Sequence, residues 1–173
     1  MTAIIRPFAA GEAAAFREIR LEALRRHPEA FGASIEEAEG SEVAAFAAGL
    51  AKPPPDAVFG AWLPGEAAPQ DMAGFFVHRP RKVAHKGAVW GVYVRAEARG
   101  QGLGRMLMQR VIDQARGAGL ETLLLTVTEA VPAARALYES LGFLAYGTEP
   151  RGLRLGPGHY VDETLMALDL RGA

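Results

Sequence analysis

The chain has 173 residues, of which 50% are hydrophobic and 23% charged, and its 19 Lys plus Arg against 20 Asp plus Glu give a formal net charge of −1. This length predicts one domain, residues 1–173, with a substantial core. The balanced charge gives no bulk field toward nucleic acid or an anionic membrane, so neither is expected as a partner. The lack of cysteine excludes disulfides, thiolate metal sites and a cysteine nucleophile.

The sequence also lacks the patterns of a signal peptide, a membrane span and a metal site. Residues 1–7 hold neither a basic leader nor a long apolar run, so no signal peptide is expected. No stretch approaches the roughly 20 apolar residues of a membrane span. The four histidines have no metal-ligand spacing among them. We therefore expect a cytoplasmic protein without a metal.

The order of residue patterns predicts an α/β chain. Pro7 ends the first strand, the triple proline at 53–55 stops the second helix, and Gly142 ends the last helix. Ser41 is the expected N-cap of the second helix. The expected elements are a strand at 2–6, a helix at 11–27, an irregular segment at 29–40, a helix from 41 to about 51, strands at 57–63, 72–78 and 85–95, a helix from 103 to 117–119, a strand at 121–128, a helix from 132 to 141, and strands at 143–148 and 160–170. This order predicts a mixed sheet with helices on both faces.

The stretch from Val89 to Arg105 carries the strongest signal of a binding site. Val89 to Val94 is rich in β-branched and aromatic residues, as in a buried strand, and Leu103 opens an apolar stripe at helical spacing. Three glycines at alternate positions form the turn between them. Glycine lets a ligand approach the backbone closely, and the first N–H groups of a helix attract anions. The stretch therefore predicts an anion site, with phosphate as the expected ligand.

Comparison of the loop with known phosphate-binding patterns indicates which kind of phosphate ligand it could hold. The dinucleotide pattern G-x-G-x-x-G fails because Arg105 stands in place of its third glycine, and no G-K-[ST] closes a P-loop. Arg99 to Gly104 instead read R-x-x-G-x-G directly after a V-x-V strand. This resembles the coenzyme A pyrophosphate loop of the GNAT-type N-acetyltransferase superfamily. The simpler alternative is a plain glycine-rich turn between a strand and a helix.

Two further stretches resemble the same superfamily. Ala134 to Phe143 matches its A-x-x-L-Y-x-x-x-G-F segment, and Arg20–Leu24 followed by Pro28–Gly32 is similar to the first helix and loop of small-molecule members. The resemblance covers nearly the whole chain. It implies the GNAT fold, a twisted, mixed and mostly antiparallel sheet of about seven strands flanked by about four helices, in the order βααβββαβαββ.

One position departs from the family pattern. The superfamily commonly has Asn three residues before the alanine that matches Ala134, and this chain has Val131. A side-chain hydrogen bond from this position to the cofactor is therefore not expected. Val131 is also a poor N-cap, which weakens the predicted helix start at Pro132.

The resemblance implies an acetyl-CoA-dependent N-acetyltransferase that acts on a primary amine of a small molecule by direct attack in a ternary complex. In this family the strand backbone pairs with the pantetheine arm, N–H groups of the glycine loop cap the pyrophosphate, and loop arginines add charge. The implied cofactor-binding residues are Val92, Tyr93, Val94, Arg99, Gly100, Gln101, Gly102, Leu103, Gly104 and Arg105. A solvated loop arginine is the alternative reading of Arg99.

Tyr138 is the candidate general acid. A phenol with a pKa near 10 is protonated at neutral pH, so it can donate a proton to a departing thiolate whose own pKa is about 8.5. The alternative is a half-buried tyrosine that only packs. The base is left open, because Glu36, Glu129 and Glu163 are each conceivable but each reads more simply as a surface carboxylate.

The acceptor pocket is expected near Phe31, Phe76 and the connection from Arg151 to Tyr160, with these three aromatic residues as its candidate contacts. Asp162 and Glu163 would suit a cationic amine, whereas Arg151 and Arg154 would suit an acceptor with a carboxylate. Trp62 and Trp90 are expected in the core rather than as stacking platforms.

Two other functions stay open at this point. A non-catalytic acyl-CoA-binding sensor would fit the missing asparagine at position 131, and a nucleotide-binding protein of another fold is disfavoured by the failed motifs. Exposed backbone edges at the two final strands also predict a homodimer.

Overall fold

The computed structural model describes residues 3–172, and its elements follow the predicted order with one extra helix. The strands are β1 (Ile4–Pro7), β2 (Ala57–Trp62), β3 (Asp71–Val77), β4 (Lys86–Val94), β5 (Thr122–Thr128), β6 (Leu144–Gly156) and β7 (His159–Asp169). The α-helices are α1 (Ala13–Arg26), α2 (Ile35–Glu39), α3 (Val43–Leu50), α4 (Leu103–Gly117) and α5 (Pro132–Ser140). Thr2, the predicted start of the first strand, lies outside the described residues.

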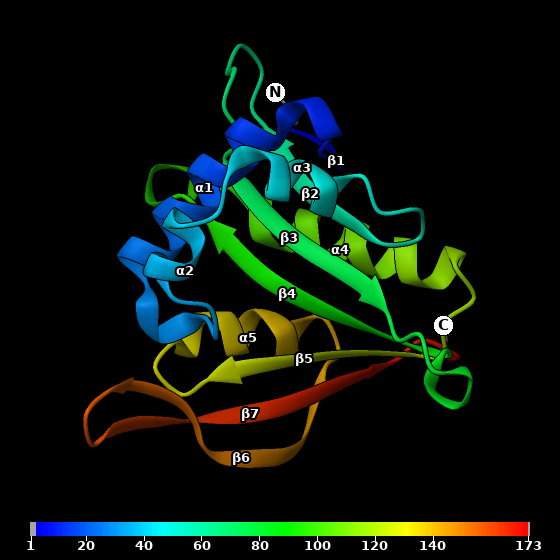
Figure 1. The fold of residues 1–173 in the computed structure, drawn as a ribbon. Coiled ribbons are helices and arrows are strands. Elements are labelled where there is room, and N and C mark those ends of the chain that lie inside the picture. Colours follow the sequence, from blue (N-terminus) through cyan, green and yellow to red (C-terminus); the bar gives the residue numbers. More distant parts are fainter. Residues whose placement is uncertain (1–2, 173) are drawn as a thin grey trace.

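The seven strands form one mixed sheet in the order β1-β2-β3-β4-β5-β7-β6 (Figure 1). Every pair of neighbours is antiparallel except β4 and β5, which are parallel. The predicted α/β class and the mixed, mostly antiparallel sheet are thus confirmed.

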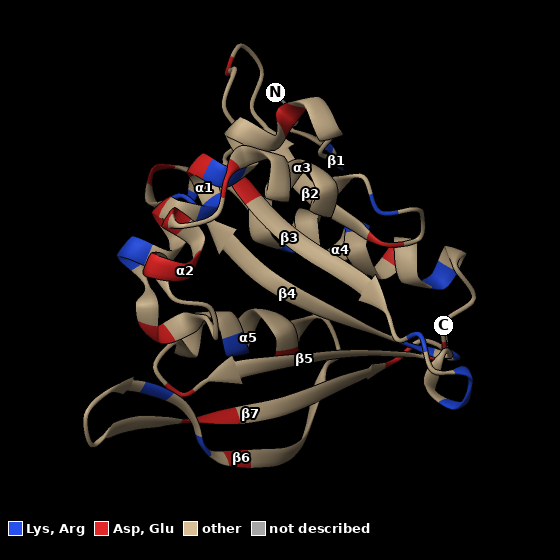
Figure 2. Cartoon of the chain, viewed as in Figure 1, with Lys and Arg blue, Asp and Glu red and all other residues tan. Residues whose placement is uncertain are grey.

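The sheet separates two apolar cores. On one face the side chains of α4 pack with those of β5, β7 and the centre of β2 and β3, and Tyr138 and Phe143 extend this core toward α5. On the other face Phe16 and Ile19 of α1 pack with Phe8, Trp62 and Tyr93. Trp62 is 8% exposed, which confirms its expected core position. Charged residues lie mainly on the helices and loops around the sheet (Figure 2).

The segment predicted as irregular at 29–40 contains a helix, so that prediction was wrong. Ser34 accepts a hydrogen bond from the N–H of Glu37, and the Glu37 side chain accepts one from the N–H of Ser34. This capping box starts α2 and was readable in the sequence as S-x-x-E. The next helix begins at Val43 with Glu42 as its N-cap rather than Ser41, whose hydroxyl instead donates to the Glu37 carbonyl.

The last hairpin is longer than the sequence indicated. β6 continues to Gly156 where a strand end at 148 and a loop were predicted. The strand absorbs a register shift between Glu149 and Leu153, within which Arg151 has φ 56° and its N–H donates to Oδ1 of Asp162 at 2.7 Å. Pairing with β7 thus overrides local signals that favour a turn.

Candidate active site

The site lies where β4 and β5 separate. The two strands pair only from Lys86 to Ala88 of β4, and beyond Ala88 β4 pairs with β3 alone, whereas β5 stays paired with β7 along its length. Figure 1 shows the two strands close together at one end and spread apart at the other. The β5-facing backbone edge of Val92, Tyr93 and Val94 is therefore open, which is where the sequence places the pantetheine arm.

A bulge at Gly91 sharpens this separation. Between the pairs Met72–Tyr93 and Gly74–Trp90, β3 places one residue and β4 places two. Gly91 has φ +65°, in the left-handed region that favours glycine. The extra residue bends β4, and such bulges re-aim side chains next to functional sites.

The glycine loop ends in an uncapped helix. Gly100 and Gly102 both have φ +77°, and a Cβ at either position would meet no atom within 4 Å. The first hydrogen bond of α4 runs from the N–H of Met106 to the carbonyl of Gly102 at 3.0 Å, so the N–H groups of residues 103–105 precede it. These donors, together with the helix dipole, fit an anionic ligand and specifically a phosphate group.

A cleft of about 510 Å³ joins the open edge of β4 to this loop. Its walls are the end of β4, the glycine loop, the start of α4, the segment after α1 and one face of α5. The lining residues are His27, Ala30, Phe31, Val92, Tyr93, Val94, Ala98, Arg99, Gly100, Gly102, Leu103, Gly104, Arg105, Val131, Ala133, Ala134, Leu137 and Tyr138. The structure thus brings together all the predicted cofactor residues except Gln101, which is exposed in the loop.

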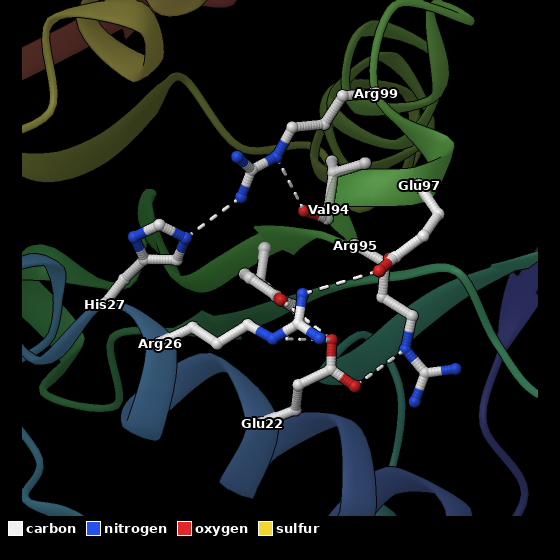
Figure 3. Close-up of polar contacts among 8 residues, drawn as sticks. Glu22, Arg26, His27, Val94, Arg95, Glu97 and Arg99 are labelled. Atoms are coloured by element: carbon white, nitrogen blue, oxygen red, sulfur yellow. Dashed lines mark hydrogen bonds and ion pairs between the residues drawn. The ribbon is translucent and has the colours of Figure 1, made fainter.

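Arg99 is oriented across the mouth of the cleft (Figure 3). Its Nε donates to the Val94 carbonyl at 3.1 Å, and its Nη2 lies 3.0 Å from Nε2 of His27. That contact makes Nε2 of His27 the acceptor and places the ring proton on Nδ1, which lies 3.4 Å from Oε1 of Glu29. These two contacts hold the solvent-exposed guanidinium beside the glycine loop.

A second group of charges joins α1 to the end of β4 (Figure 3). Glu22 accepts a hydrogen bond from the Tyr93 hydroxyl at 2.9 Å and pairs with Nε of Arg95 at 3.0 Å. Burial, followed by the contact with Glu22, raises the pKa of Tyr93 to about 12. Arg26 lies 3.8 Å from Glu22 and 3.6 Å from Glu97, which links α1 to the turn that follows β4.

The helix that carries Tyr138 starts without a side-chain cap. Val131 occupies the N-cap position and Pro132 the first helical position, so α5 begins where the sequence predicted despite the poor cap. Nη2 of Arg105 donates to Oγ of Ser140 at 2.7 Å, and this bond ties the start of α4 to the end of α5. A Cβ at Gly104 would lie 3.4 Å from side-chain atoms of both Leu137 and Val94, so α4, α5 and β4 meet closely at this position.

Tyr138 is 6% exposed and lines the cleft. Its ring packs against Phe143 with centroids 6.0 Å apart. Burial raises the pKa of its phenol above the usual value, so the hydroxyl is protonated at neutral pH. A second, smaller cavity of about 80 Å³ lies between the separated strands, and Tyr138 lines it together with Trp90, Gly91 and Thr128.

The three aromatic residues expected around the acceptor lie apart. Phe31 lines both the cleft and the smaller cavity. Phe76 lines a separate hollow of about 180 Å³ beneath α3, and Tyr160 stacks under the Arg151 guanidinium at 3.9 Å on the β6–β7 hairpin. Trp90, expected in the core, is only partly buried and lines both the hollow and the smaller cavity.

The three candidate bases differ in their surroundings. Glu36 and Glu129 are exposed, whereas Glu163 is partly buried on β7. Burial, with a smaller contribution from Glu149, raises the pKa of Glu163 above its usual value. A carboxyl group with a raised pKa is better matched to accepting a proton near neutral pH.

Sequence reasoning missed several residues that line the cleft. His27 and Ala30 come from a segment far from the glycine loop in sequence, and Ala98 directly precedes Arg99 in the turn that leads into the loop. Ala133, Ala134 and Leu137 were assigned to the core stripe of α5. The three α5 residues line the cleft because α5 packs beside the start of α4, and no local pattern in the sequence indicates this packing.

Within residues 3–172, no group of three or more His, Cys, Asp or Glu side chains is placed to hold a metal ion. None of the helices described is long and apolar enough to cross a membrane.

The chain belongs to the acetyltransferase (GNAT) family, because the model of that family matches residues 7–143. The resemblance found in the glycine loop and the A-x-x-L-Y-x-x-x-G-F segment is thereby confirmed.

Curated relatives match over part of their length. The L-amino acid N-acyltransferase MnaT of Escherichia coli is 36% identical over 80 residues, which are 46% of this chain and 45% of that protein. The ribosomal protein bS18-alanine N-acetyltransferase of Salmonella typhimurium is 34% identical over 99 residues, 57% of this chain and 65% of that protein. The chain thus spans about half the length of the curated relatives it matches.

Solved structures match over the whole chain. An acetyltransferase of the GNAT family from Streptococcus pneumoniae has a TM-score of 0.82 at 23% identity and covers 97% of this chain and 99% of its own. The Salmonella typhimurium protein yncA, solved with its cofactor acetyl-CoA, has a TM-score of 0.78 at 25% identity and covers 100% of this chain and 96% of its own. The first of these similarities establishes the fold alone.

Proposed function

We propose that this protein transfers an acetyl group from acetyl-CoA to a primary amine. The observation that carries the proposal is the continuous cleft that joins the open edge of β4 to the free N–H groups of α4, with Tyr138 in its wall. Family membership supports it, as do the relatives named as an N-acyltransferase and an N-acetyltransferase and the acetyl-CoA in the yncA structure.

The cleft has the donors that coenzyme A requires. Peptide groups of Val92 to Val94 can pair with the amides of a pantetheine arm, and the start of α4 can hold a pyrophosphate. Arg99 and Arg105 add positive charge beside it. Val131 offers no side-chain hydrogen bond, so binding depends on the backbone of the loop and strand.

When bound, acetyl-CoA supplies an activated acetyl thioester. Tyr138 then acts as the general acid, because its buried phenol keeps its proton until a thiolate forms nearby. The amine must lose a proton before it attacks, since an alkyl ammonium has a pKa of about 10.4. The base stays open among Glu36, Glu129 and Glu163, none of which lines the cleft or the smaller cavity, and each could act directly or through water.

The relatives act on two kinds of amine acceptor. MnaT acts on L-amino acids, and another relative acts on an alanine of the ribosomal protein bS18. We propose a small-molecule acceptor for this chain, as its sequence predicted, with Phe31 beside the acceptor and Phe76 and Tyr160 as more distant candidates.

The oligomeric state and the location are part of the same proposal. β6 is one of the two edge strands of the sheet, and its Leu144 and Tyr146 are 73% and 60% exposed. β7, which was also predicted to have an exposed edge, is paired on both sides, so that part of the prediction was wrong. The features of β6 support a homodimer formed along its edge. A monomeric mass by light scattering at tens of micromolar would contradict it. The cytoplasmic location stays a prediction.

Two measurements test the proposed function. Calorimetric titration should show binding of CoA and no comparable binding of NAD or ATP. Release of free thiol from acetyl-CoA should then depend on an added amine, and an amine screen at fixed acetyl-CoA identifies the acceptor. Binding of acetyl-CoA without thiol release from any amine would instead indicate the acyl-CoA sensor.

A further inference from the structure

Arg20 is a partly buried cation without a protein partner. It projects from α1, and its Nη1 is buried and forms no hydrogen bond. No other residue between 3 and 172 forms an ion pair or a side-chain hydrogen bond with it. Arg95, by contrast, pairs with Glu22 at 3.0 Å. Burial lowers the pKa of Arg20, but a guanidinium stays charged at any physiological pH, so this charge is left uncompensated.

Two aromatic rings flank the guanidinium and leave its donors unused. The centre of the Arg20 guanidinium lies 5.1 Å from the ring centroid of Phe31 and 5.6 Å from that of Trp90. Such contacts stabilise the charge but do not hydrogen-bond to the N–H groups, which lie in the guanidinium plane. An anion that approaches in this plane would therefore gain both charge pairing and hydrogen bonds.

The guanidinium lies against the point where the two strands separate. Nη1 of Arg20 is 3.3 Å from the place where a Cβ at Gly91 would stand, so the bulge glycine leaves room for it. Gly91, Phe31 and Trp90 all line the 80 Å³ cavity that Tyr138 also lines. Arg20 is thus adjacent to the space in which an amine would meet the thioester.

Arg20 lies behind three residues that line this cavity, and one polar atom in the cavity wall itself has no partner within residues 3–172. Oγ1 of Thr128 is buried without a hydrogen bond, and Thr128 lines this cavity. One unpartnered polar group in the cavity wall and one behind it, beside Gly91, indicate a polar ligand, because buried polar groups are otherwise hydrogen-bonded.

We infer that Arg20 binds a carboxylate of the acetyl acceptor, and that the acceptor is an amine with a carboxylate close to its nitrogen, as in an α-amino acid. The planar fork of a guanidinium matches a carboxylate through two parallel hydrogen bonds. Because the cavity is small, it fits an acceptor in which only a few bonds separate the carboxylate from the amine. This inference rests on the proposed acetyl transfer and names its substrate class.

The test compares matched acceptors. A panel of L-amino acids, their amides and their decarboxylated amines is assayed for thiol release at saturating acetyl-CoA. The variants are Arg20→Met, which keeps an apolar stem, Arg20→Lys, which keeps the charge without the fork, and Arg17→Met as the control. Arg17 lies one turn earlier on α1 and donates to the carbonyls of Ser41 and Glu39, away from the cavity.

Wild type should use at least one amino acid with a kcat/KM at least about 10-fold above that of its amide. Arg20→Met should lower kcat/KM for that amino acid by about 10- to 100-fold, through KM, and leave the amide unchanged. Arg20→Lys should lower kcat/KM for that amino acid less than Arg20→Met does, and Arg17→Met should have the wild-type value. The affinity for acetyl-CoA should be the same in all four proteins.

Two outcomes overturn the inference alone. One is equal use of amino acids, amides and decarboxylated amines by wild type, and the other is an equal loss for acids and amides in Arg20→Met with a lowered melting temperature. Absence of thiol release with every amine would overturn the proposed acetyl transfer itself, and the inference with it.

Discussion

The phenolic oxygen of Tyr93 lies 2.9 Å from Oε1 of Glu22, although 71 residues separate the two in the chain. The bond joins α1 to the strand that forms one wall of the cleft. Tyr93 is 4% exposed and the Glu22 side chain 22%, so the bond is partly buried. Glu22 also pairs with Arg95, which follows directly on β4. This contact fixes the position of the first helix relative to the cofactor cleft.

Removal of the Tyr93 hydroxyl should therefore destabilise the protein. We expect Tyr93→Phe to lower the free energy of unfolding by about 1.5–3 kcal/mol, the range for hydrogen bonds to charged groups, because Glu22 loses a buried donor. Urea denaturation measures the change. The matched control is Tyr146→Phe on the exposed part of β6, which should unfold like wild type. Equal stability of the two variants would show that the bond contributes nothing.

The glycine loop gives a second prediction. Gly102→Val should weaken CoA binding at least about 10-fold, because the branched side chain would occupy the open space above the loop and strain a backbone with φ +77°. Gly119→Val is the control, since Gly119 has φ +74° and equally open surroundings at the far end of α4. It should lose similar stability and keep wild-type affinity. Unchanged CoA affinity in folded Gly102→Val would place the phosphate site elsewhere.

Tyr138→Phe separates catalysis from packing. The substitution keeps the buried ring and removes the proton donor, so kcat should fall by about 10²- to 10⁴-fold while the affinity for acetyl-CoA stays near wild type. Measurement of kcat, of Kd and of the melting temperature on one variant checks this. Full activity with a lower melting temperature would mean that the hydroxyl serves only the packing of α5, with water protonating the thiolate.

The buried carboxyl group of Asp71 should make the stability of the protein depend on pH. Its side chain is 0% exposed, and neither carboxyl oxygen has a hydrogen-bond partner within residues 3–172. Burial raises its pKa from 3.8 to about 8, which the nearby N–H of Ala61 only partly offsets. Between these two pKa values the folded protein keeps a proton that the unfolded chain releases. This group therefore makes stability fall as pH rises from about 4 to about 8, and adds no slope above that.

Replacement of Asp71 by asparagine should remove this dependence. We expect Asp71→Asn to raise the melting temperature at pH 8 more than at pH 5, because the amide never needs to ionise. Thermal unfolding across this range measures it, with Asp113→Asn on the outer side of α4 as the exposed control. Parallel pH profiles for wild type and Asp71→Asn would show that Asp71 does not control the slope.

Most elements of the fold could be read from local patterns. The stripe Leu103, Leu107, Val111 predicted α4, and its members are buried as expected. Pro132 marked the start of α5 even without a capping side chain. The helix at Ile35 was missed although its capping box is visible in the sequence, because the segment has few apolar residues to signal a helix. The end of β6 was missed for another reason, since long pairing with β7 outweighs local turn preferences.

The sequence by itself determined the glycine loop, the helix that follows it and the position of Tyr138 on α5, because these depend on backbone conformation and spacing within a few residues. Only the tertiary structure decided how far β4 separates from β5, which follows from the unbroken pairing of β5 with β7. It also decided that His27 meets Arg99 and that Arg20 lies unpaired between Phe31 and Trp90. Such contacts join residues that are distant in the chain, and their geometry exists only once the helices have packed on the sheet.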